Sequence, residues 1–545
     1  MEFDPVLIAP RQARMEEAGY WFNLNLTQLL EDAKNKVPDQ TALVSYSVER
    51  GQQREFSYTQ LWDMVNRVAI GLQKLGVVEH DVVACQLPNC WQFTVLYAAC
   101  SRIGAVFNPL MPIFRERELE FMLGHGQAKV FVVPQTFRNF DHAGLAQQLQ
   151  RKLSSLEHVI VVDGVDNSFD QRLVEHQPTS QQLQALDQYQ LAPNQVTQLI
   201  FTSGTTGEPK GVMHTSNTLF ANIIPYAQRL GLNAQDVVLM ASPMAHQTGF
   251  MYGLLMPIQL QAKVVLQDIW DVAQAVKLIE QQQVSFTMAS TPFLNDLSSY
   301  VAEHSEVKVD SLNSFLCAGA PIPGPLVQKA RENLHIQVIS AWGMTECGAV
   351  TMTYPTDPEE RAYNTDGIAL PGVEIKIVDR HGQEKPVGTA GRLLIRTCSN
   401  FAGYLKRPHL NDTDAQDWFD TGDIAYQDDE GYIRICGRKK DVIIRGGENI
   451  PVAEIESLLY QHPKIATVAL VAYPDERLGE RACAIVKLKD PQQQIDLAEM
   501  IDFLQQHHLA KQYLPERLEV WDQIPMTPSG KIQKFKLREL LALNR

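Results

Sequence analysis

The sequence lacks the features that would place the protein in a membrane or outside the cell. Its most apolar segment, from Gly249 to Leu260, is too short to cross a bilayer, which needs roughly 20 residues. The N-terminus has neither the basic start nor the apolar stretch of a secretory signal. The eight scattered cysteines contain no C-x-x-C pair, so neither a zinc site nor a redox motif is expected, and the thiols are predicted to be reduced.

Basic residues are also scarce. The chain has 48 Lys and Arg against 63 Asp and Glu, which gives a formal charge of −15. This balance argues against a general nucleic-acid binder, because that affinity depends on clustered cations. A single small anion needs only a local positive site and is not excluded. We therefore expect a cytoplasmic protein, and loose contact with a membrane stays open.

At 545 residues the chain is too long for one compact core, so at least two domains are expected. Short apolar and β-branched runs alternate with helical patterns at 272–279 and 326–334, which predicts a largely parallel sheet covered on both faces. The predicted strands are Leu199–Thr202, Val237–Met240, Val264–Leu266, Ser285–Ala289, Ser314–Cys317 and Ile336–Ala341. The Gln-rich stretch from Asn167 to Gln198 is typical of a surface connection.

Near Gly437 the composition changes to a basic, glycine-containing run. Beyond it come a helix near 455–459, apolar runs at 467–471 and 482–488, and a helix near 497–504. About a hundred residues suffice for a small domain. We therefore predict a large α/β domain over residues 1–439, with layered and mostly parallel sheets, and a small α+β domain over residues 440–545.

The strongest local pattern runs from Thr202 to Gly211. Glycines let backbone N–H groups approach an anion closely, hydroxyls add donors, and Lys210 adds a positive charge suited to phosphate. It is not a Walker A loop, because Lys210 is followed by Gly211. The alternative is a flexible surface loop. The predicted phosphate-binding residues are Thr202, Ser203, Gly204, Thr205, Thr206, Gly207 and Lys210.

This segment resembles the phosphate loop of the acyl-adenylate-forming superfamily, which contains acyl-CoA synthetases, adenylation domains and luciferases. The resemblance extends from about Leu29 onward, because further motifs of that superfamily follow in order. They are Trp342-Gly-Met-Thr-Glu346, Tyr404 in a Gly-Tyr pair, Thr421-Gly-Asp423, Gly437-Arg-Lys-Lys-Asp441 and Pro528-Ser-Gly-Lys531. The segments 243–250 and 445–449 most resemble bacterial short- and medium-chain or alicyclic acyl-CoA ligases.

The resemblance implies an ATP-dependent acid–CoA ligase of fatty acid metabolism that uses Mg²⁺. Such an enzyme joins a carboxylate to AMP, releases pyrophosphate, and then transfers the acyl group to coenzyme A. By resemblance, Thr345 contacts the α-phosphate, Glu346 binds Mg²⁺, and Lys531 bridges the carboxylate and the α-phosphate from a mobile C-terminal lid. His246 resembles the residue that separates the acyl site from the thiol channel, and its alternative is a hydrogen-bonded core histidine.

The same resemblance assigns the nucleotide and thiol contacts. Asp423 and Arg438 are expected at the ribose, because a carboxylate can accept from both hydroxyls of a diol. Trp342, with Gly343, is expected on one face of the adenine and Gly319-Ala320-Pro321 on the other. Lys440 resembles the hinge between the domains. Gly446 and Gly447 are expected to line the pantetheine channel.

The acid-binding pocket is predicted from residues that lie near the pocket segments of the superfamily. Its candidates are Phe250, Met251, Ser290, Thr291, Phe293, Ala318 and Met344. Their character favours an aliphatic, alicyclic or simple aromatic acid over an amino acid. Two alternatives stay open: an enzyme that loads a free carrier protein, and a silent nucleotide-binding regulator. We expect a monomer or homodimer, with acylation of Lys531 as a regulatory hypothesis.

Two segments depart from the pattern of the superfamily. Gly391-Arg392-Leu393 stands where many relatives carry Gly-Glu-Leu, and 397–400 reads Thr-Cys-Ser-Asn in place of Gly-Pro-Asn. Both are expected to support the nucleotide site without taking part in the reaction.

Overall fold

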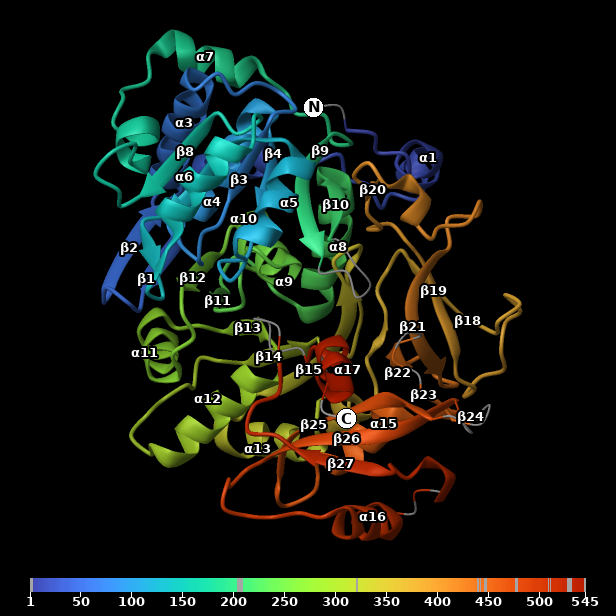
Figure 1. Cartoon of the computed structure of the whole chain (residues 1–545). Coiled ribbons are helices and arrows are strands. Elements are labelled where there is room, and N and C mark those ends of the chain that lie inside the picture. The colour runs from blue at the N-terminus through green and yellow to red at the C-terminus, as the bar shows by residue number, and fades with distance from the viewer. Residues whose placement is uncertain are drawn as a thin grey trace.

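The computed structural model describes residues 3–202, 209–319, 322–438, 441, 443–445, 448–475, 479–507, 509, 511–526 and 532–543. Across this part of the chain, no helix is both long and apolar enough to cross a bilayer. Figure 1 shows a large unit made of the N-terminal elements and a smaller unit, coloured orange to red, that holds the last elements of the chain.

A nine-stranded sheet forms one layer of the large unit. Its central strands are parallel, whereas β2, β16 and β17 extend its edges in antiparallel fashion. In spatial order the strands are β17 (Ile368–Ala369), β16 (Gly348–Met352), β15 (Gln337–Met344), β14 (Ser314–Ala318), β13 (Phe286–Ala289), β11 (Val237–Met240), β12 (Lys263–Gln267), β1 (Thr41–Ser47) and β2 (Gln52–Ser57).

A seven-stranded sheet forms the second layer. It is parallel from β9 to β8, and β10 and β20 pair antiparallel at its other edge. Its order is β20 (Gly403–Tyr404), β10 (Lys210–Thr215), β9 (Val196–Thr202), β4 (Val106–Pro109), β3 (Val82–Cys85), β5 (Ala128–Pro134) and β8 (His158–Val162). A short hairpin of β6 (Thr136–Phe137) and β7 (Phe140–Asp141) follows β5.

Helices cover both sheets, and the largest core lies between the sheets. That core includes side chains from α2 (Leu26–Lys36), α3 (Tyr58–Lys74), α4 (Trp91–Ile103), α7 (Ser180–Gln188), α8 (Ser216–Leu230), α10 (Met256–Leu260) and the π-turns at Asp170–Val174 and Met251–Leu255. The outer face of the seven-stranded sheet packs against α5 (Glu116–Gly126) and α6 (His142–Lys152). The outer face of the nine-stranded sheet packs against α11 (Val272–Gln282), α12 (Thr291–Glu303), α13 (Gly324–Leu334) and α14 (Glu359–Asn364).

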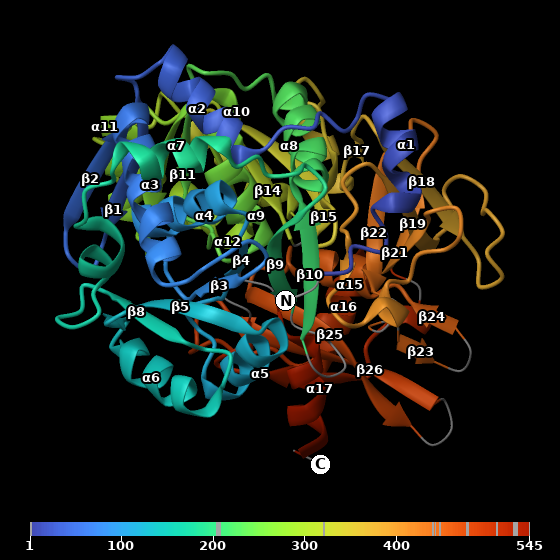
Figure 2. The same ribbon diagram turned by 90° about the horizontal axis from the view of Figure 1, so that it is seen from above.

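A four-stranded antiparallel sheet completes the large unit, in the order β18 (Val373–Val378), β19 (Gly391–Thr397), β21 (Phe419–Gln427) and β22 (Ile433–Arg438). Its apolar face shares a core with β10, β20 and the end of β15. The short helix α1 (Ala9–Glu17) lies on the same side of the molecule, as Figures 1 and 2 both show. The ends of strands from three sheets therefore meet in one region.

The C-terminal unit is an α+β sandwich of its own. Its sheet has the order β24 (Glu448–Ile450), β23 (Ile443–Arg445), β26 (Gly479–Leu488) and β25 (Ile465–Asp475), and β27 (Arg517–Val520) pairs with β26. One face packs against α15 (Val452–Leu459) and α16 (Leu497–Gln506), and the other against α17 (Lys534–Leu543). Short 3₁₀ turns occur at Pro408–Leu410 and Lys511–Tyr513.

The predicted fold class is confirmed, with two corrections. The strand predicted at Leu199–Thr202 belongs to the seven-stranded sheet, not to the sheet of the other five predicted strands. The stretch 167–198 is more than a surface connection, because it forms a π-turn and α7 and buries Phe169 and Leu173. The prediction missed these few buried side chains because most residues of the stretch are polar, many of them glutamines. The domain boundary predicted at Lys440 lies outside the described residues and stays a prediction.

Two glycines with positive φ provide a test of local packing. Gly367 has φ +89°, and a Cβ there would collide with the backbone of Met352, whereas Gly388 has φ +76° and open space around it. We expect Gly388→Ala to cost about 1 kcal/mol for its left-handed backbone. Gly367→Ala adds overpacking and should cost about 3 kcal/mol or more. Thermal unfolding of both variants measures this difference, and equal midpoints would contradict it.

Candidate active site

Lys210, Tyr404 and Glu346 form a continuous chain of hydrogen bonds. The Lys210 ammonium donates to the Tyr404 hydroxyl at 2.7 Å, and that hydroxyl donates to Glu346 Oε1 at 2.6 Å. Tyr404 is 3% exposed and Glu346 is 4% exposed. Burial, followed by the neighbouring Glu346 carboxylate, raises the pKa of Tyr404 well above its ordinary value, so the hydroxyl keeps its proton. A cation and a carboxylate are thus held on either side of one neutral donor.

Strand pairing explains how these three residues meet. Lys210 begins β10 and pairs with Thr202, the last residue of β9. Tyr404 on β20 pairs with Val212 on the other side of β10. Glu346 comes from the turn between β15 and β16 in the nine-stranded sheet. The chain of bonds therefore joins the two large sheets at one point.

The turn that carries Thr345 and Glu346 is tightly constrained. Gly343 has no room for a side chain, because a Cβ would collide with the backbone of Gly348 across the β15–β16 pair. Behind the turn, the Asn222 amide donates to the Ala349 carbonyl at 2.6 Å and accepts from the Tyr252 hydroxyl at 2.6 Å. The backbone of the turn is fixed from both sides.

His214 fixes the same turn from β10. Its Nε2 lies 2.8 Å from the Thr345 carbonyl oxygen, and its Nδ1 lies 3.0 Å from Thr218 Oγ1 on α8. Because a carbonyl can only accept, Nε2 carries a proton in this arrangement. The ring is 1% exposed, and burial lowers the pKa of His214 to about 4. His214 is therefore neutral at neutral pH.

A second polar cluster surrounds Asp423. Its Oδ1 accepts from Arg438 Nε at 2.8 Å, and its Oδ2 accepts from the Trp342 indole N–H at 3.1 Å. Asp423 and Arg438 are paired residues of β21 and β22, whereas Trp342 belongs to β15. Asp423 is 3% exposed and Arg438 is partly exposed. Trp342 of this cluster precedes Glu346 by only four residues. The two clusters therefore border one region.

The structure also describes several other predicted site residues. Gly319 has φ +89° and open space where a Cβ would be. His246 caps the short helix α9 (Gln247–Phe250), where its side chain accepts from the Thr248 N–H at 3.4 Å. Phe250 and Met251 are fully buried in the core between the sheets. The half-buried pocket candidates are Ser290, Thr291, Phe293, Ala318 and Met344.

Several predicted residues lie outside the described part of the chain. They are Ser203, Gly204, Thr205, Thr206, Gly207, Ala320, Pro321, Lys440, Gly446, Gly447 and Lys531. The structure brings together Lys210 and Glu346 through Tyr404, and Trp342, Asp423 and Arg438 through the second cluster. Trp342 is corrected in one respect, because it lies within β15 and does not follow that strand.

Sequence reasoning gave no role to Tyr404 or His214. Tyr404 was noted only as half of a Gly-Tyr pair, and His214 lies four residues after Lys210, directly after the apolar pair Val212 and Met213. A polar side chain on a strand that is buried on both faces is the signal that identifies His214. The segment 397–400, which departs from the family pattern, contacts the same turn, since Ser399 Oγ donates to the Cys347 carbonyl at 2.8 Å.

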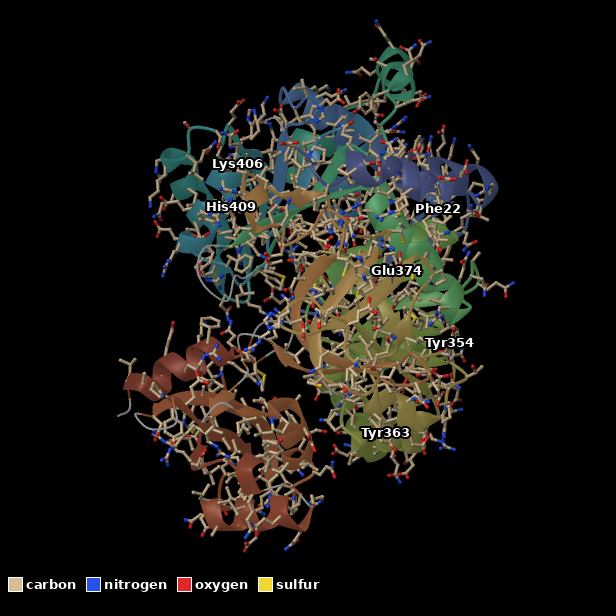
Figure 3. The ribbon with its side chains drawn as sticks, turned by 90° about the vertical axis from the view of Figure 1, so that its right-hand side faces the viewer. Phe22, Tyr354, Tyr363, Glu374, Lys406 and His409 are labelled. Atoms are coloured by element: carbon tan, nitrogen blue, oxygen red, sulfur yellow. The ribbon has the colours of Figure 1, made fainter. Side chains whose placement is uncertain are left out.

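A separate cleft lies between the large unit and the C-terminal unit. It has a volume of about 1060 Å³ and is lined by residues of α13, α14 and α15, among them Gln328, Glu454 and Tyr363, which is labelled in Figure 3. None of the residues of the two polar clusters lines it. The cleft shows where the two units face one another.

Comparison with known proteins identifies the family. The sequence pattern of the AMP-binding enzyme family matches residues 30–405, and that of the AMP-binding enzyme C-terminal domain matches residues 454–531. The chain belongs to the AMP-binding enzyme family. It is 36% identical over 531 residues to the medium-chain fatty-acid–CoA ligase of Escherichia coli (strain K12), covering 97% of this chain and 92% of that protein.

Other known proteins are similar to this one over nearly the whole chain. A 2-hydroxy-7-methoxy-5-methyl-1-naphthoate–CoA ligase of Streptomyces carzinostaticus is 31% identical over 96% of this chain and 95% of its own. The solved structure of the anthranilate CoA ligase AuaEII with anthranoyl-AMP superposes with a TM-score of 0.86 over 96% of this chain and 98% of that one. At 24% identity, that structure supports the fold.

The lowered pKa of His214 predicts a pH effect on stability. The unfolded chain would bind a proton near pH 6.5 but the folded protein only near pH 4, so stability is full above pH 6.5 and falls as the pH drops through this window. Between pH 7 and pH 5 this residue should contribute a loss of about 2 kcal/mol. His214→Gln keeps a donor for the Thr345 carbonyl and cannot titrate. Its unfolding free energy should fall less than that of the wild type, and identical pH dependence would contradict the assignment.

Proposed function

We propose that this member of the AMP-binding enzyme family is an AMP-forming acid–CoA ligase. The carboxylate oxygen of the acid would attack the α-phosphorus of ATP, forming an O–P bond as the bond to pyrophosphate breaks. The thiol of coenzyme A would then attack the acyl carbonyl, lose its proton and expel AMP. The observation that carries the proposal is the pair of clusters around Glu346 and Asp423, which suit the two ends of a nucleotide.

The phosphate end is assigned to Lys210, Tyr404, Glu346 and Thr345. In the structure the Tyr404 hydroxyl already holds the Lys210 ammonium at the site. Lys210 would therefore need little change of rotamer to bind the phosphates. His214 holds the backbone carbonyl of Thr345. This contact would help to present the Thr345 hydroxyl to the α-phosphate in a fixed orientation. Preorganised donors and cations of this kind stabilise the charge that develops on phosphoryl oxygens.

The residues fit Mg²⁺ bound together with ATP. Glu346 supplies a hard carboxylate oxygen, and Mg²⁺ in proteins takes one or two carboxylates, with phosphate oxygens and water in its other positions. Among the described residues no group of three or more His, Cys, Asp or Glu side chains could hold a metal ion alone. Glu346 would therefore hold the ion jointly with the triphosphate. The ion would offset the negative charge of the phosphate oxygens.

The nucleoside end is assigned to Asp423, Arg438 and Trp342. The Asp423 carboxylate already accepts from Arg438 and Trp342, and its remaining lone pairs can accept from the ribose hydroxyls. The indole bond to Asp423 fixes the plane of the Trp342 ring next to the ribose position. Such a ring can stack on adenine, with Gly319 and the two residues after it on the opposite face.

The two reaction steps need different lid positions. Lys531 would bridge the acid and the α-phosphate in the first step, and the segment around Gly446 and Gly447 would line the thiol channel in the second. We propose that the C-terminal unit rotates near Lys440 between these positions. A polar interface between the units, such as the cleft lined by α13, α14 and α15, suits relative motion better than an apolar one would.

The acid is proposed to be a medium-chain fatty acid or a simple aromatic acid. The half-buried residues near the predicted pocket are small or apolar, with Ser290, Ala318 and Met344 as examples. The relatives named above act on a medium-chain fatty acid and on a substituted naphthoate. We further propose that His246 separates this pocket from the thiol channel, and that the enzyme is cytoplasmic and works as a monomer or homodimer.

Pyrophosphate release over a panel of carboxylic acids tests the function directly. We expect acid-dependent release of pyrophosphate, and acyl-CoA and AMP as products once coenzyme A is added. The panel should include C4 to C12 fatty acids, benzoate and an amino acid as the negative control. Pyrophosphate release that does not change when coenzyme A is added would favour loading of a carrier protein. No pyrophosphate release with any acid would favour a nucleotide-binding regulator.

A lysine substitution separates the two steps. Lys531→Ala should lower the rate of adenylation by about 10²-fold or more, because the charge that brings two anions together is lost. The same variant should convert supplied acyl-adenylate and coenzyme A to acyl-CoA at nearly the wild-type rate. Single-turnover assays of each step measure this, with the substitution of the neighbouring Lys534 by Ala as the control. Equal loss of both steps would contradict the proposed lid.

A further inference from the structure

The N-terminal residues 5–21, which we call the strap, include α1 and precede the segment matched by the family pattern. The strap packs against a loop almost four hundred residues further along the chain. Figures 1 and 2 show α1, in dark blue, on the side of the molecule that carries β18 and β19. Nothing in the proposed chemistry uses the strap, so its contacts call for a separate explanation.

Arg11 makes the central contact of the strap. Its side chain is 1% exposed, and Nη1 donates to the carbonyls of Asn400 at 2.6 Å and Phe401 at 3.0 Å. Its Nη2 donates to Asp417 Oδ1 at 2.7 Å. Burying a guanidinium is costly unless it is paired and hydrogen-bonded, and here both terminal nitrogens have partners. The planar group thus fixes two successive carbonyls and one carboxylate in a single orientation.

Two further bonds join the strap to the same loop. The Trp21 indole N–H donates to the Cys398 carbonyl at 2.9 Å, and the Leu7 N–H donates to the Ala402 carbonyl at 3.2 Å. The strap therefore binds the carbonyls of residues 398, 400, 401 and 402, which belong to what we call the support loop, residues 398–402. A loop held at almost every carbonyl has little freedom to shift.

The opposite side of the support loop contacts the turn that carries Glu346. The Phe401 N–H donates to the Glu346 carbonyl at 2.7 Å, and Ser399 Oγ donates to the Cys347 carbonyl at 2.8 Å. Two residues beyond the loop, the Tyr404 hydroxyl bonds Glu346 Oε1. The support loop is thus held between the strap on one side and the backbone of the Glu346 turn on the other.

We propose that Arg11 is a positioning residue for MgATP, acting through the support loop on Glu346 and Tyr404. The inference rests on the proposed function of the Glu346 cluster. Arg11 would act without contacting substrate, because it holds the loop that supports the proposed metal-binding carboxylate and the hydroxyl next to it. Displacement of such a group by about 1 Å is enough to weaken binding and slow the reaction strongly.

Arg11→Lys provides the primary test. Lysine keeps the charge, but one ammonium cannot reproduce the fork that holds two carbonyls and Asp417. We expect MgATP affinity, measured by calorimetry, and the rate of pyrophosphate release each to fall roughly tenfold, as is typical when a supporting partner of a metal ligand is lost. The Mg²⁺ concentration for half-maximal release should rise. Conversion of supplied acyl-adenylate to acyl-CoA, which uses no triphosphate, should change less than about twofold.

Two matched variants accompany it. Arg14→Gln is the control, because Arg14 lies on the same helix and pairs with the same Asp417 but is 39% exposed and, within the described part of the chain, makes no hydrogen bond to the support loop. It should behave as the wild type. Trp21→Phe keeps an aromatic side chain but removes the bond to the Cys398 carbonyl, so it should show a smaller loss of MgATP affinity with the second half-reaction intact. This variant tests the strap if Arg11→Lys does not fold.

The outcomes separate the two proposals. Unchanged MgATP affinity in both Arg11→Lys and Trp21→Phe, or equal loss of both half-reactions, would overturn the positioning role. A wild-type protein that binds MgATP but makes no acyl-CoA from any acid would overturn the proposed function. In that case a selective loss of MgATP affinity in Arg11→Lys would still support the role of Arg11.

Discussion

The Tyr404 hydroxyl accepts a hydrogen bond from an ammonium of one sheet and donates a hydrogen bond to a carboxylate of another. Because the site is shielded from water, this pair of bonds is stronger than it would be at the surface. Without the hydroxyl, Lys210 and Glu346 would have to meet directly or remain apart, and either change would alter the site where we propose that the phosphates bind. The pairing of β20 with β10 and the turn after β15 both serve to bring the three groups to these positions.

The same region holds together because other buried polar groups restrain its backbone. His214 binds the Thr345 carbonyl, Asn222 binds that of Ala349, and the Phe401 N–H binds that of Glu346. The Trp342 indole donates to Asp423 and so links β15 to the four-stranded sheet. Each of these bonds is modest by itself, but the groups are buried, and an unpaired partner would cost about 1–3 kcal/mol. The backbone around Glu346 is therefore restrained by buried hydrogen bonds from several elements.

Local sequence patterns predicted the elements well and their arrangement less well. The strand Val237–Met240 was placed at its observed bounds, because a short apolar run between turn residues has one clear interpretation. The assignment of β9 to a second sheet could not be predicted, since strand neighbours depend on long-range packing. Lys210 and Glu346 were found from ordered motifs, whereas the strap was missed because Arg11, in a polar helix, resembles a solvated surface residue. In the structure, its 1% exposure and its bonds to Asn400, Phe401 and Asp417 show otherwise.

A double-mutant cycle on Tyr404→Phe and Glu346→Gln, read as MgATP affinity, tests this central interaction most directly. If the hydroxyl acts through Glu346, Tyr404→Phe should weaken binding in the wild-type background and have little further effect when Glu346→Gln is already present. The coupling should then reach about 1–3 kcal/mol. Losses that simply add, within about 0.5 kcal/mol, would show that Tyr404 and Glu346 act independently and would contradict the account.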